Sequence, residues 1–184
     1  MEFTNEQKLI ITLLTEIHAS LEIRDGVDPE FVQNAVTSGR TWALHWQYPG
    51  IFRGEAETPD EVIFVTQVLE LWERIERSYA ELSEEGKAQV ERDADPLGTH
   101  VTFPGFDGNG GDGDAYGTAH LLINKMGRWE DFSDRDLNSH MPMGESYQRM
   151  LDALKDLDKG SMDYYFSPEE LVVLMKSRMH PSNR

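Results

Sequence analysis

An acidic turn at residues 107–114 carries the side chains of this sequence that are best suited to bind a cation. Carboxylate and amide oxygens are the hard ligands that calcium prefers. The turn departs from the EF-hand pattern, because Gly111 stands where that loop needs Asp or Asn. We therefore expect either a cation site or a flexible acidic turn in which one aspartate caps the next helix. The candidate ligands are Asp107, Asn109, Asp112 and Asp114.

Two histidines flank this turn, and they widen the range of metals that it could bind. His100 precedes the turn and His120 follows it. Imidazole together with carboxylates suits transition metals, so the six side chains could form one site for a divalent cation. A metal-dependent enzyme, hydrolase-like in its chemistry, is the function that such a site would support. The alternative is that both are ordinary surface or core histidines held by a hydrogen bond.

Other catalytic chemistries find little support in the sequence. The glycines at positions 108, 110 and 113 match a dinucleotide-binding fingerprint, but the surrounding aspartates would repel a pyrophosphate and no βαβ pattern follows. The sequence contains no Gly-x-Ser-x-Gly, Ser-x-x-Lys or His-Glu-x-x-His motif. It also has no cysteine, which excludes thiol nucleophiles, disulfides and cysteine-ligated metals.

The elements that must position these residues are amphipathic helices. Four helix starts carry strong capping signals, at Thr4, Asp28, Thr58 and Ser167, and the last three are each followed by proline at the first helical position. Apolar residues then recur at intervals of three or four. The predicted helices span about 5–23, 29–39, 59–82, 83–95, 114–126, 142–159 and 168–175, and residues 40–52 are expected to form a short helix and a bend at Pro49-Gly50.

These patterns together predict an all-α fold. We expect a multihelical single domain covering residues 1–184, with one short extended or loop segment around residues 101–113. A parallel sheet is not expected, since only the start of that segment resembles a strand.

Charge and composition limit the partners of the protein. Hydrophobic residues make up 39% of the chain and charged residues 28%, and both values are typical of a globular protein. The net charge of −17 repels phosphate backbones and anionic lipids, so we expect no non-specific nucleic-acid binding and no membrane binding. No apolar run approaches the roughly 18 residues of a membrane span, and the N-terminus lacks the basic region of a signal peptide. We therefore expect a cytoplasmic protein.

Four blocks of sequence, at residues 1–10, 101–107, 127–132 and 142–151, lie in one order along nearly the whole chain, and together they resemble the YfbU family. The resemblance implies a bacterial cytoplasmic protein that is mainly helical, and the family has no established activity and no assigned catalytic residues. The sequence departs from the family pattern in the insert at 108–114 and at Gly144, where a bulky aromatic residue is usual.

Two functions from different classes follow as expectations. We favour a non-enzymatic cytoplasmic helical module that assembles with itself as a homo-oligomer or binds a protein partner, because aromatic helices occur without a catalytic constellation. The alternative is the metal-dependent enzyme built on the acidic turn with His100 and His120. Apart from that possible divalent cation, we expect no cofactor.

Overall fold

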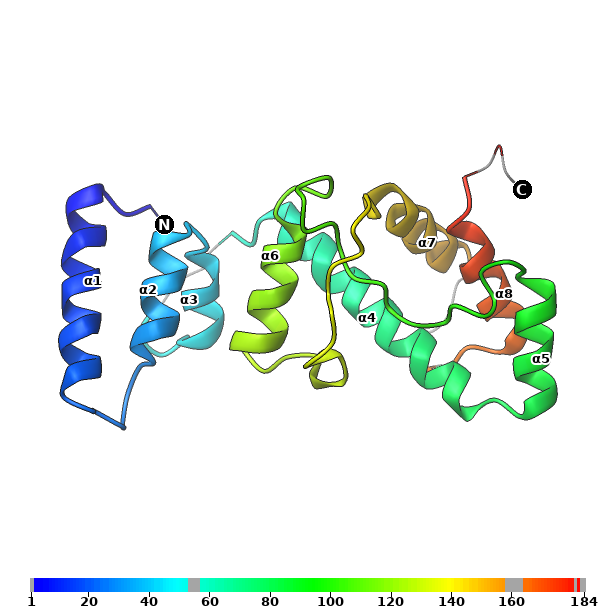
Figure 1. Cartoon of the computed structure of the whole chain (residues 1–184), viewed down its shortest axis with the longest axis horizontal. Helices are drawn as coiled ribbons and strands as arrows, with labels where there is room; N and C mark the ends of the chain where they lie inside the picture. Colours follow the sequence, from blue (N-terminus) through cyan, green and yellow to red (C-terminus); the bar gives the residue numbers. More distant parts are fainter. Residues whose placement is uncertain (1, 53–56, 158–163, 181, 183–184) are drawn as a thin grey trace. The chain divides into compact units, whose positions relative to one another are not determined.

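Helices joined by turns make up the computed structural model, which describes residues 2–52, 57–157, 164–180 and 182 (Figure 1). Over these ranges the β-structure is limited to an isolated bridge between Phe106 and Asn138. The all-α prediction is therefore confirmed. The chain divides into two compact units, Met1–Asp60 and Glu61–Arg184, which we describe separately. The prediction of one domain over residues 1–184 stays a prediction.

The first unit consists of α1 (Asn5–Ser20), α2 (Pro29–Thr37) and α3 (Trp42–Gln47). The predicted capping box opens α1, since Thr4 and Gln7 exchange backbone-to-side-chain hydrogen bonds of 2.9 and 3.3 Å. Asp28 caps α2 by accepting from the N–H groups of its first turn. Both helices end two or three residues earlier than their apolar patterns predict.

The second unit is built around α4 (Asp60–Glu81), whose first residue closes the first unit. The other elements are α5 (Glu84–Asp93), α6 (Ala115–His120), the π-turn η1 (Leu121–Lys125), the 3₁₀ turn η2 (Glu130–Phe132), α7 (Gly144–Asp156) and α8 (Pro168–Ser177). The predicted capping box at Ser167 and Glu170 is present at the start of α8.

The start of α7 is the clearest difference from the predicted elements. Pro142 was expected to open this helix, but α7 begins at Gly144, with Met143 as its N-cap residue. The reason is a tertiary contact, because a carboxylate from the acidic turn binds the N–H groups of Met143 and Gly144. The predicted end of this helix at residues 159–160 lies outside the described residues.

An aromatic cluster forms the centre of the second unit. Trp72 of α4 is fully buried, and Phe103 lies against it with a centroid distance of 6.1 Å. Phe103 also contacts Phe106, Phe132 and Tyr147, at 5.7, 5.1 and 6.1 Å. The rings come from α4, the segment before the acidic turn, η2 and α7, so their burial holds these elements together.

The Tyr147 hydroxyl adds a directional contact to this cluster. It donates a hydrogen bond to the Gly105 carbonyl, and burial raises the pKa of Tyr147 well above its ordinary value. The hydroxyl therefore stays protonated and remains a donor. Gly105 itself has φ +88°, and a Cβ there would overlap the Leu137 carbonyl group. Only glycine fits this position, because it has no Cβ and adopts positive φ readily.

The segment at residues 101–106 is hydrogen-bonded to α4 and leads directly into the acidic turn. The Phe103 N–H donates to Glu76 Oε1 of α4 at 2.7 Å. Phe106 is held on both sides, because its N–H donates to the Leu137 carbonyl and its own carbonyl accepts from Ser139. These bonds fix the backbone immediately before Asp107, where the candidate ligands begin.

Candidate functional site

Asp107 is buried, and its carboxylate organises the acidic turn from within. Oδ1 accepts from the backbone and side-chain amides of Asn109, both at 3.0 Å, and Oδ2 accepts from the Gly111 N–H at 3.0 Å. The Asn109 backbone bond is the largest cause of a lowered pKa for Asp107, and the Asn109 side chain, Gly111 and the charge of His140 act in the same direction. Asp107 is therefore held as a carboxylate by donors from its own loop.

Asp112 links the acidic turn to the start of α7. Its carboxylate accepts from the Met143 N–H at 2.8 and 2.9 Å, from the Gly144 N–H at 2.8 Å and from the Asp107 N–H at 2.9 Å. The first N–H groups of a helix lack intrahelical partners and attract negative charge. Asp112 therefore caps α7, which lies far along the chain, whereas the sequence suggested a cap for the helix directly after the turn.

Asp114 precedes α6 as its N-cap residue, but its side chain makes no capping hydrogen bond. Glu61, at the start of α4, instead accepts hydrogen bonds from α6 and from the residue before it. It accepts from the Asp114 N–H at 3.2 Å and from the Thr118 hydroxyl at 3.3 Å. The prediction that Asp112 or Asp114 caps the following helix is therefore wrong, because the Asp112 carboxylate binds the start of α7 and the Asp114 side chain makes no capping hydrogen bond.

Asn138 completes the hydrogen bonding of the turn, and sequence reasoning missed both it and Glu61. Asn138 Oδ1 accepts from the N–H groups of Gly108 and His140, each at 2.9 Å. Neither residue belongs to a motif that includes residues 107–114. Their roles could be predicted only by knowing which distant segments meet in the folded chain.

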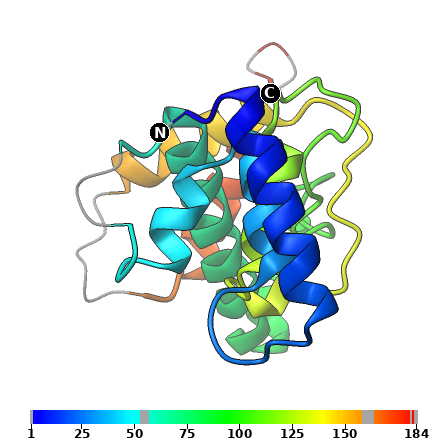
Figure 2. The ribbon, with the colours of Figure 1, turned by 90° about the vertical axis from the view of Figure 1, so that its left-hand side faces the viewer.

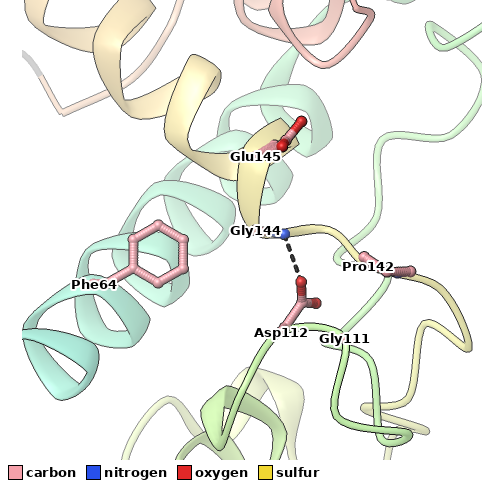
Figure 3. A pocket seen from close by; sticks show the side chains of 6 residues that line it. All are labelled: Phe64, Gly111, Asp112, Pro142, Gly144 and Glu145. Carbon is pink, nitrogen blue, oxygen red and sulfur yellow. Dashed lines mark hydrogen bonds between the residues drawn. The ribbon is translucent and has the colours of Figure 1, made fainter.

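A pocket of about 280 Å³ opens beside the start of α7 (Figure 3). The Asp112 carboxylate points at the Gly144 N–H, whereas the Glu145 side chain is 93% exposed. A Cβ at position 144 would lie 3.2 Å from Asp112 Oδ1, so a larger residue there would press on the cap. The pocket is lined by Phe64, Gly111, Asp112, Pro142, Gly144 and Glu145.

The two histidines do not join the carboxylates in a metal-binding group. His100 and His120 are both exposed, and the His120 ring lies 6.3 Å from that of Tyr116. Across the part of the chain that the structure describes, no three His, Asp or Glu side chains are placed to hold a metal ion. The structure brings Asp107, Asn109 and Asp112 together, but the two carboxylates accept from backbone N–H groups and the Asn109 side chain donates to Asp107. Cation binding by this turn stays a hypothesis.

Helix α1 presents a second candidate site, an apolar face that points to solvent. Six large aliphatic residues are each between 51% and 67% exposed. They recur every three or four residues and so lie on one side of the helix. We call this surface the α1 stripe; it consists of Leu9, Ile10, Leu13, Leu14 and Ile17 together with the C-cap residue Leu21.

The opposite side of α1 packs within the first unit, as Figure 2 shows with α1 in front of α2. Thr15 is the buried residue of this helix, and its hydroxyl donates to Gln33 of α2 at 2.9 Å. Ile11, Thr12 and His18 are partly buried on the same side. The less apolar side of α1 therefore faces α2, and the more apolar side is left outward.

The described residues contain no helix that is both long enough and apolar enough to cross a membrane. Fold and site together define a multihelical protein with a carboxylate-capped loop and one helix whose apolar side is exposed. The model of one family, the YfbU domain, matches residues 1–176. The chain therefore belongs to the YfbU family, as the resemblance indicated. Comparison with curated proteins and with solved structures gives no match.

Replacing Asp112 should destabilise the second unit. Asp112→Asn keeps the shape but removes the charge that binds three N–H groups, so we expect the free energy of unfolding to fall by about 1–2 kcal/mol. Urea denaturation followed by circular dichroism measures this. Asp134→Asn is the matched control, because Asp134 is exposed. A surface substitution of this kind should change stability by less than about 0.5 kcal/mol. Equal stabilities of the two variants would contradict the capping role.

The lowered pKa of Asp107 predicts a pH dependence with a definite sign. The pKa of Asp107 is lower in the folded state than in the unfolded state. The stabilisation of the folded state by this carboxylate is therefore complete above the ordinary carboxyl pKa of about 4, and it is lost as pH falls towards the folded pKa. We expect Asp107→Asn to be less stable than the original chain at neutral pH and the difference to shrink in acid. Denaturation curves from about pH 7 to about pH 3 test this. A difference that stays constant would contradict it.

The cation hypothesis makes a separate prediction. If the turn binds calcium, magnesium, manganese or zinc, calorimetric titration should give a saturable heat that Asp107→Asn abolishes and Asp134→Asn retains. The cation would have to displace the N–H groups of Asn109 and Gly111 from the carboxylate. Flat titrations with all four metals would remove the hypothesis.

Proposed function

We propose that this protein is a non-enzymatic cytoplasmic interaction module and that it binds another protein surface through the α1 stripe. The observation that carries the proposal is the outward direction of the six aliphatic side chains on α1. The partner is a helical protein surface, either a second copy of the chain or another protein.

The size of the α1 stripe supports this proposal. Burying apolar surface is worth about 25 cal/mol per Å², and complete burial of a large aliphatic side chain is worth about 1.5–3 kcal/mol. Dividing the second value by the first gives roughly 100 Å² of apolar area for each side chain. Each of the six side chains is more than half exposed. Together they present roughly 350 Å² of apolar area. Patches in the range of about 300–600 Å² are the largest that monomers usually expose, and they are often functional.

The chemistry around the stripe favours a protein over a nucleic acid or a charged lipid surface. The chain has a net charge of −17, which repels polyanions. The stripe itself contains only aliphatic side chains at helical spacing, the arrangement by which an amphipathic helix binds an apolar groove or a second helix. A protein surface with matching apolar side chains is the partner that removes this area from water.

Introducing charge into the stripe should abolish binding. We expect the original chain to show a mass above 21.0 kDa by size-exclusion chromatography with light scattering, or to recover a partner in a pull-down. Leu13→Glu with Ile17→Glu should lose that behaviour, because burying two carboxylates in an apolar interface is costly. Both residues are exposed, so the variant should keep the helical circular dichroism of the original chain.

Val173→Glu is the matched control for this experiment. Val173 lies on α8 and is 45% exposed, so the same substitution is made outside the stripe. It should keep the association of the original chain. The proposal is contradicted if the original chain is a strict monomer at high concentration and recovers no partner, or if the stripe variant binds as well as the control.

A further inference from the structure

We draw no further inference here: the strongest candidate, the exposed aliphatic face of α1 that forms the α1 stripe, is the surface on which the proposed function already rests, and nothing in the described part of the chain shows which molecule covers it.

Discussion

Phe103 makes the contacts on which the arrangement of the second unit depends. Its ring lies against Trp72, Phe106, Phe132 and Tyr147, with centroid distances between 5.1 and 6.1 Å. Burying large rings supplies most of the attraction in such a core, and edge-to-face geometry adds direction to it. The backbone N–H of Phe103 is also hydrogen-bonded to Glu76 of α4. This bond and the ring cluster together determine where the following acidic turn lies.

Carboxylates in and beside this turn accept hydrogen bonds from backbone N–H groups. Asp107 closes the loop on itself, Asp112 caps α7, and Glu61 binds the N–H before α6. Each interaction joins an acidic side chain to amide donors that would otherwise lack partners, which is favourable in a low-dielectric position. The excess of acidic residues in the sequence is therefore partly structural, and Gly144 leaves the room that the Asp112 cap needs.

In helix α1 the less apolar side is packed and the more apolar side is exposed. A hydrogen bond from Thr15 joins it to Gln33 of α2 and Ile11 is partly buried, while its aliphatic stripe remains outward. A folded chain gains stability by burying such residues, and exposed apolar patches of this size are often functional. This is why the proposed function of this member of the YfbU family concerns α1 and not the acidic turn.

Helix positions could be predicted well because their causes are local. The capping boxes at Thr4 and Ser167 and the Asp28 cap act within a few residues, and apolar periodicity is visible within a few turns of helix. The candidate site was predicted less completely. Its aspartates at positions 107 and 112 do meet in one turn, but the roles of Glu61 and Asn138 arise from segments far away in the chain.

The α1 stripe illustrates the same division. Its spacing along the helix is plain in the sequence, yet periodicity says that a helix has an apolar side and not what that side faces. Likewise, the negative charge of Asp112 is local, but its use as the cap of α7 depends on which helix start the folded chain brings within hydrogen-bond distance. Sequence alone was enough for the helical class, the caps at Thr4, Asp28 and Ser167, and the family. Tertiary structure decided the partners, because packing selects contacts by distance in space and not by distance along the chain.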